Sequence, residues 1–171
     1  MIDRSKEEEL ARLIVDQEGH EVILTTEYLD RHLHIDLIVV QRNHIAPGIV
    51  DTTLLTVDVK AARKYRSLDS RVSYTHTWLE LFNVQGKPGS IQGAADVIAL
   101  ELEDRYILVD RLPLANDVYE LWKHTGQGYV SNPNPLQFLQ RTGRKDGVLW
   151  YPIERAAPWI TLEVFKYAQD K

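Results

Sequence analysis

The residues of this chain best suited to chemistry are two carboxylates and one amine, Asp36, Asp58 and Lys60. Asp58 and Lys60 are two residues apart in the run 54–60, whose apolar and β-branched residues predict a strand. Because side chains alternate faces along a strand, these two would share one face. Asp36 stands near the start of a second apolar run, 35–40. If the two strands pair, Asp36 joins the other two side chains.

Two acids and a lysine on one sheet face are typical of a divalent-metal site with a charge-stabilising or proton-managing amine beside it. The simpler interpretation of Asp58 and Lys60 stays open, because an Asp-x-Lys on a strand is usually an ion pair on a solvated face. Asp36 lies among apolar residues, and burying an unpaired carboxylate is costly. It therefore needs a partner or a metal ion.

Several predicted elements must position these residues. Leu10, Leu13 and Ile14 have the spacing of an amphipathic helix that begins at Ser5 and ends near Gly19, with Glu7 on the same face. The predicted strands are 21–26, 35–40, 54–60, 73–82 and 106–109, with another apolar strand after a short helix within 94–102. Further along, we expect a helix at 114–124, a helical turn at 135–141, and strands, or a strand and a short helix, at 148–153 and 159–167.

The segments between these elements are predicted to be connections. Residues 27–34 form a polar connection or hairpin turn, in which His32 and His34 are expected to be exposed or to contact DNA. Residues 41–53 form an extended connection that contains the turn dipeptide Pro47-Gly48. Asp96, at the start of a hairpin, is expected to be a hydrogen-bonded structural acid rather than a metal ligand.

Composition restricts the class of protein. The 171 residues suit one domain, 1–171, with 44% hydrophobic and 26% charged residues, as in ordinary globular proteins. The absence of cysteine excludes disulfides and thiolate sites, and it suits a reducing compartment such as the cytoplasm. The polar N-terminus is unlike a signal peptide, and no apolar run is long enough for a membrane span.

Charge is distributed unevenly. The net charge of −5 argues against a protein that coats nucleic acid by bulk charge. Basic residues nevertheless gather after the Asp58 strand, and the members of this cluster are Lys60, Arg63, Lys64, Arg66 and Arg71. Glu80, on the predicted strand 73–82, would add an acid to the site if that strand neighbours the Asp58 strand, or would otherwise pair with one of the arginines.

The order of these motifs resembles the PD-(D/E)XK nuclease superfamily. A helix with Glu7, a strand, a strand with Asp36 and a strand with Asp58-Val59-Lys60 follow one another. Glu7-Glu8-Glu9-Leu10 is similar to the first helix of Holliday junction resolvases. The later order of motifs is similar to small phage and prophage members, and it comprises Trp78-Leu79-Glu80, Gly86-Lys87-Pro88-Gly89, Ala95-Asp96 and the apolar run 106–109. The resemblance covers residues 6–112, and the extension 113–171 carries no such motif.

The resemblance implies an α/β (α+β) fold with a restriction-endonuclease-like core, a central mixed β-sheet flanked by helices. It implies a metal-dependent DNA endonuclease, phage-encoded and acting in the host cytoplasm, that uses Mg²⁺ or Mn²⁺. Asp36, Asp58 and the main chain of Val59 would hold the metal ion, with Glu7 assisting and Lys60 acting in catalysis. The residues expected to contact DNA phosphates are Arg63, Lys64, Arg66, Arg71 and Lys87.

Other functions stay open at this point. The same fold without cleavage would give a DNA- or protein-binding module or an inhibitory protein. The acidic pI of about 5.7 slightly favours this class, because it would suit a partner with a basic surface. In a purely structural protein, Asp58 and Lys60 would form an ordinary ion pair. A symmetric homodimer would explain paired cuts in two strands, although no decisive interface stripe is visible in the sequence.

Overall fold

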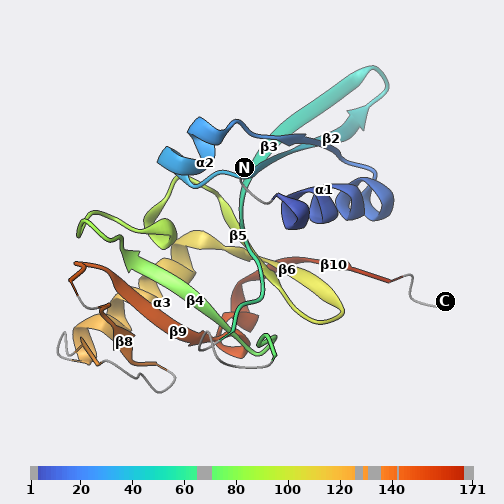
Figure 1. The fold of residues 1–171 in the computed structure, drawn as a ribbon. Coiled ribbons are helices and arrows are strands. Elements are labelled where there is room, and N and C mark those ends of the chain that lie inside the picture. Colours follow the sequence, from blue (N-terminus) through green and yellow to red (C-terminus); the bar gives the residue numbers. More distant parts are fainter. Residues whose placement is uncertain (1–3, 65–70, 126–128, 131–135, 142, 168–171) are drawn as a thin grey trace.

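The computed structural model of the protein describes residues 4–64, 71–125, 129–130, 136–141 and 143–167. Figure 1 shows two β-sheets with helices around them. The helices are α1 (Ser5–Glu18), α2 (Glu27–Leu33) and α3 (Arg111–His124), with short 3₁₀ segments η1 (Ser90–Gln92) and η2 (Ile153–Trp159). The larger sheet contains, in spatial order, β1 (Glu21–Leu24), β2 (Leu37–Ala46), β3 (Ile49–Lys60), β5 (Val97–Glu101), β6 (Arg105–Asp110) and β10 (Ile160–Phe165). The smaller sheet contains β4 (His76–Phe82), β9 (Gly147–Pro152), β8 (Phe138–Leu139) and β7 (Tyr129–Val130).

The larger sheet is mixed, as predicted. Its neighbouring strands are antiparallel except for β3 and β5, which run parallel. Helix α1 packs along this sheet near β1 and β10 and buries Leu10, Leu13 and Ile14, the residues whose spacing predicted it. The helix ends at Gly19, whose φ of 68° is a left-handed conformation that glycine adopts without steric cost. The predicted mixed α/β class, with helices flanking a mixed sheet, is therefore confirmed.

Residues 27–34 differ from the predicted polar connection, because they form helix α2. Thr26 is its N-cap, and His34 ends it with a φ of 54°. The helix buries none of its own residues fully, so it lacks the apolar stripe by which an amphipathic helix is recognised in a sequence.

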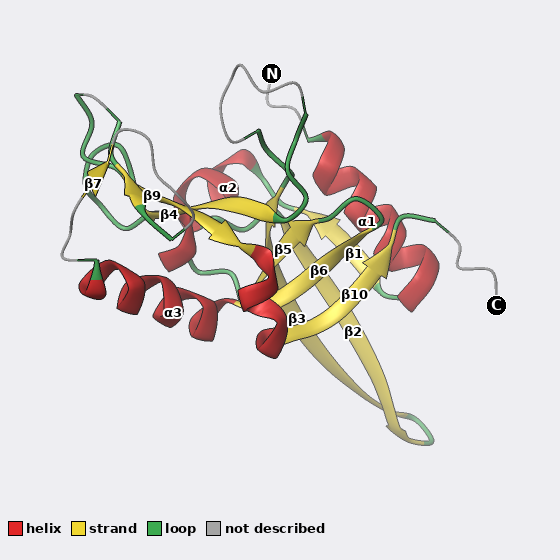
Figure 2. Ribbon diagram, turned by 90° about the horizontal axis from the view of Figure 1, so that it is seen from below, coloured by secondary structure: helices red, strands yellow, loops and turns green. Residues whose placement is uncertain are grey.

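Residues 41–53 also differ from the prediction. They extend β2 and β3 into a long antiparallel hairpin rather than an irregular connection, and Gly48, with a φ of 80°, lies at the turn. Figures 1 and 2 show this hairpin projecting beyond the rest of the sheet. Its residues from 42 to 54 are all exposed. Its most exposed large apolar side chains are Ile45, Leu54 and Ile49.

Two hydrophobic cores lie on opposite faces of the β5–β6 hairpin. The first core joins α1 to the larger sheet and contains Leu10, Leu13, Ile14, Leu37, Val39, Val57, Val59, Val97, Ala99, Tyr106, Leu108 and Val164. The second core joins the hairpin to β4, β9 and α3 and includes Ile98, Leu100, Ile107, Val109, Leu79, Leu81, Leu114, Val118, Leu149 and Tyr151. Figure 2 shows α1 and α3 on opposite sides of the molecule, with the hairpin between them. Alternate residues of β5 and β6 therefore belong to different cores.

The last third of the chain contributes to both sheets. Strand β9 pairs with β4, and β10 pairs with β6. The helical turn predicted at 135–141 is wrong, because residues 138–139 form strand β8 beside β9. The short helix predicted near residue 94 is also absent from the described structure, where residues 94–96 lead directly into β5. Among the described residues, no helix is both long enough and apolar enough to cross a membrane.

Asp96 is the structural acid that the sequence predicted. Its Oδ2 atom accepts hydrogen bonds from the Thr56 backbone N–H at 2.9 Å and from the Thr56 hydroxyl at 2.7 Å. The Asp96 backbone N–H in turn donates to the Thr56 carbonyl at 3.0 Å. These bonds fasten the start of β5 to β3, immediately before Asp58.

Candidate active site

The pairing of β2 with β3 brings the two predicted acids together. Leu37 is paired with Val57, so Asp36 lies opposite Asp58 one residue beyond that pair. The Asp36 backbone N–H donates to the Val57 carbonyl at 2.8 Å, which continues the strand pairing to this point. Opposite residues of an antiparallel pair project from the same face with Cβ atoms about 5 Å apart. Both carboxylates are buried, with 6% of Asp36 and 3% of Asp58 exposed.

Each carboxylate has one defined partner. The Val59 backbone N–H donates to Asp36 Oδ2 at 2.6 Å, and Lys60 Nζ donates to Asp58 Oδ1 at 2.7 Å. Asp58 Oδ2 is buried and has no hydrogen-bond partner among the described residues. A buried carboxylate oxygen without a partner is energetically costly, and a bound cation would remove that cost.

Burial controls the protonation of Asp36. Burial first, and the charge of Asp58 in addition, raise the pKa of this carboxyl to about 7 against the opposing effects of the Val59 N–H and of Lys60. Asp36 therefore keeps its proton to a higher pH than an exposed aspartate does. A cation between the two carboxylates would favour the ionised form of Asp36, so its binding should release a proton.

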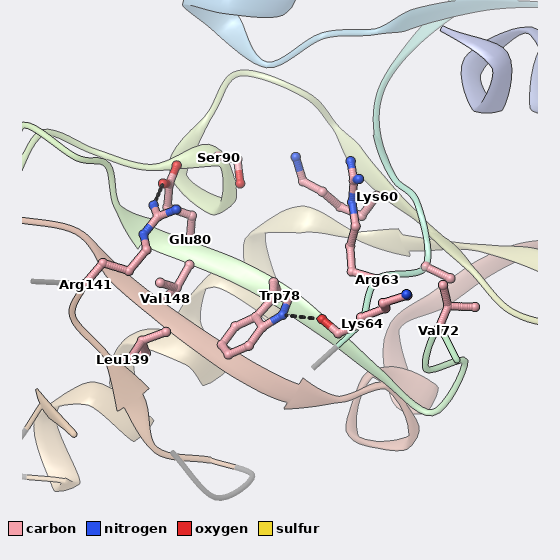
Figure 3. A pocket seen from close by; sticks show the side chains of 11 residues that line it. Lys60, Arg63, Lys64, Val72, Trp78, Glu80, Ser90, Leu139, Arg141 and Val148 are labelled. Carbon is pink, nitrogen blue, oxygen red and sulfur yellow. Dashed lines mark hydrogen bonds and ion pairs between the residues drawn. The ribbon is translucent and has the colours of Figure 1, made fainter. Parts of the chain in front are cut away.

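A pocket of about 990 Å³ opens beside Lys60, between the end of β3 and the smaller sheet (Figure 3). Lys60, Arg63 and Lys64 form one side, which we call the basic wall. Trp78, Leu139 and Val148 come from three strands of the smaller sheet, and we call them the apolar floor. Glu80, Ser90 and Arg141 complete the far end.

Glu80 lines this pocket from the smaller sheet. Its strand, β4, belongs to the smaller sheet and is not paired with β3. Glu80 forms an ion pair with Arg141 at 3.9 Å, and not with one of the described arginines of the cluster after Asp58, which the sequence suggested as partners. Burial raises the pKa of Glu80, while the positive charges of Arg141, His34 and Lys60 oppose the rise. The carboxyl thus faces the same pocket as Lys60 without joining Asp36 and Asp58.

Glu7 lies apart from the two aspartates. It lines a smaller pocket with Val59, Ala62 and Arg63, and its Oε2 atom is buried without a hydrogen-bond partner among the described residues. Val59 belongs to the first core, on the face of β3 opposite Asp58. The structure therefore brings Asp36, Asp58 and Lys60 together but does not bring Glu7 into their group.

The predicted phosphate-contacting residues separate into three sets. Arg63 and Lys64 lie in the basic wall. Arg71 and Lys87 are exposed and lie outside the residues that line the pocket. Arg66 falls outside the described residues. The structure adds Arg141 and Trp78 to the pocket. Their positions depend on the pairing within the smaller sheet, for which the sequence carries no local signal.

No known protein indicates the function of this site. Comparisons with protein-family models, curated proteins and solved structures found no match.

The site is limited in the metal ligands it offers. Within the described part of the chain, no three His, Asp or Glu side chains converge closely enough to hold a metal ion. Asp36 and Asp58 still fit a magnesium ion, because Mg²⁺ is commonly held by one or two carboxylates and completes its shell with water and substrate phosphate. The buried, unpartnered Asp58 Oδ2 is the observation that favours a cation here.

Proposed function

We propose that this protein is a metal-dependent nuclease that hydrolyses phosphodiester bonds of DNA at Asp36, Asp58 and Lys60. The observation that carries the proposal is the pair of buried carboxylates on the β2–β3 hairpin, with Lys60 Nζ 2.7 Å from Asp58 Oδ1. This arrangement supports the role that the resemblance to the PD-(D/E)XK superfamily implies for each of the three residues.

Asp36 and Asp58 would hold Mg²⁺ or Mn²⁺, with the Val59 carbonyl as the expected main-chain ligand. The bound ion would polarise the phosphate and lower the pKa of a water molecule. Asp36 must lose its proton to serve as a ligand. Because its pKa is about 7, metal binding and cleavage should both strengthen as the pH rises through neutrality.

Lys60 supplies the positive charge beside the carboxylates. Its ammonium group has three donors, of which Asp58 accepts one. The others can orient the attacking water or stabilise the negative charge that develops on phosphorus-bound oxygens in the transition state. Lys60 also lines the pocket, so a phosphate that enters along the basic wall meets the amine next to the acids.

The test is cleavage of labelled duplex, single-stranded and four-way-junction DNA with Mg²⁺, Mn²⁺ or EDTA. We expect cleavage only with metal, and a loss of about a hundredfold or more in Asp58→Ala and Lys60→Ala. Asp51→Ala is the matched control, because Asp51 is an exposed aspartate on the same strand, in the projecting hairpin. It should cleave like the wild type.

A thermal-shift experiment provides a second readout of the metal site. Mn²⁺ should raise the Tm of the wild type and of Asp51→Ala but not of Asp58→Ala, because only the folded pair of carboxylates binds the ion. The absence of both cleavage and a Tm shift would contradict the nuclease proposal. It would favour a binding module in which Asp58 and Lys60 form a structural ion pair.

A further inference from the structure

The floor of the Lys60 pocket is one face of the smaller sheet. Glu80 is paired with Val148 across β4 and β9, and Val148 is paired with Leu139 across β9 and β8. These three side chains therefore form a row on one face, and Trp78 lies on the same face two residues before Glu80. The row offers a broad apolar surface that ends at a carboxylate.

Trp78 is held in place on this floor. Its Nε1 donates to the Lys64 carbonyl at 3.2 Å, which ties the ring to the basic wall (Figure 3). The ring also packs against Trp150, with centroids 4.7 Å apart and an interplanar angle of 48°. Leu79 and Leu81, on the other face of β4, fill the second core, whereas Trp78 is only half buried. A fixed, partly exposed aromatic ring loses little conformational entropy when a ligand stacks on it.

The net positive charge near Trp78 lies on one side of the ring. The basic wall carries three cationic side chains there, whereas at the far end the charge of Arg141 is offset by its ion pair with Glu80. A phosphate would therefore be attracted to the basic wall rather than to the far end. A carboxylate can instead accept hydrogen bonds from the amino and imino groups on the edge of a nucleobase.

An apolar aromatic floor, a basic wall and a terminal carboxylate match the parts of one nucleotide. We propose that this pocket receives an unpaired nucleotide, with its base on Trp78, its base edge toward Glu80 and its phosphate on the basic wall. In an intact duplex both faces of each base are covered by their neighbours, so the base cannot stack on a protein ring. The preferred substrate is therefore single-stranded DNA or DNA with unpaired nucleotides. The inference rests on the proposed nuclease function and specifies its substrate.

The test measures binding in EDTA, where no cleavage occurs. Fluorescence anisotropy compares a labelled single strand of about 12 nucleotides, a length within the usual range for such sites, with the matching duplex. We expect the wild type to bind the single strand at least about tenfold more tightly than the duplex. Trp78→Ala should weaken single-strand binding by about tenfold to hundredfold, the effect of losing one base–aromatic stack, and change duplex binding by less than about twofold.

Two further variants separate stacking from folding. Trp78→Phe keeps an aromatic face and should retain most of the single-strand affinity even if Trp78→Ala fails to fold. Tyr119→Ala removes an exposed aromatic ring on α3, outside the pocket, and should have no effect. Equal affinity for the two DNA forms, or an unchanged single-strand affinity in a folded Trp78→Ala, would overturn the inference.

The two proposals can fail separately. Metal-dependent cleavage that Trp78→Ala does not alter on single-stranded DNA would leave the nuclease standing and remove the nucleotide pocket. Trp78-dependent binding of single strands without cleavage under any metal condition would retain the pocket and remove the nuclease.

Discussion

At the scale of single residues, the unusual property of the site is the protonation of Asp36. Burial, with the charge of Asp58 in addition, raises its pKa from 3.8 to about 7. Between these two values the folded protein holds a proton that the unfolded chain has released. The free energy of unfolding should therefore fall as the pH rises through this window, because the unfolded state binds fewer protons than the folded state.

Asp36→Asn tests this protonation directly. The amide oxygen can still accept the Val59 N–H, but the side chain no longer titrates. We expect the wild type to lose about 1–3 kcal/mol more stability than the variant between about pH 5 and about pH 8, since one pKa unit corresponds to about 1.4 kcal/mol. Urea denaturation in EDTA across this range measures the difference. Parallel curves for the two proteins would mean that Asp36 is ionised throughout.

At the scale of elements, a charge cluster around the buried Glu101 connects α1 and the residue after β10 to the larger sheet. Glu101 Oε1 on β5 accepts from Lys6 of α1 at 2.7 Å and from Lys166, just after β10, at 2.8 Å. Glu101 Oε2 accepts the Ala62 N–H at 2.8 Å. Burial alone would raise the pKa of Glu101, but these hydrogen bonds together lower it. The stabilisation is therefore present above the usual glutamate pKa of about 4.5 and is lost as the pH falls through the lowered value.

Removal of the negative charge of Glu101 should lower the free energy of unfolding. Glu101→Gln leaves the nearly buried Lys166 without its counter-charge, so we expect a destabilisation of about 3 kcal/mol at neutral pH in urea denaturation. Glu163→Gln is the control, because Glu163 makes a more exposed pair with Arg105 at 3.5 Å and should cost less than about 1 kcal/mol. Similar losses in the two variants would contradict a special role for Glu101.

Most elements that bury an apolar face were predictable from the sequence, with the exception of β8, whose two residues are too few to show a period. The runs around Asp36 and Asp58 alternate between the first core and the site, so period-two spacing predicted the face on which each acid lies. The pairing of β2 with β3, which the sequence left open, brings the two acids together. Helix α2 was missed because it buries no residue fully, and the projecting hairpin because its exposed strands carry no burial pattern. Trp78 lies on β4 and Arg141 just after β8, and both joined the site because these strands pair with β9. Strands β4 and β9 are about 70 residues apart and share no local signal.

At the scale of the whole molecule, the β5–β6 hairpin is the structural link between the two cores. Ile98 and Leu100 face the second core, and Ala99 and Leu108 face the first. Neither core is complete without this hairpin. The pocket depends on the same link, because its basic wall follows β3 of the larger sheet and its floor belongs to the smaller sheet. Loss of either core should therefore disrupt the site.

The tryptophans allow this coupling to be measured. All four lie in elements on the side of the second core: Trp78 in β4, Trp122 in α3, Trp150 in β9 and Trp159 in η2. Leu37 lies on β2 in the first core and is fully buried. Leu37→Ala should destabilise the first core by about 2–5 kcal/mol, the usual cost of such a cavity. If the cores unfold together, the transition seen by tryptophan fluorescence moves by the same amount as the one seen by far-UV circular dichroism. An unshifted fluorescence transition beside a shifted circular-dichroism transition would instead divide the chain into two independent units and leave the basic wall and the apolar floor able to separate.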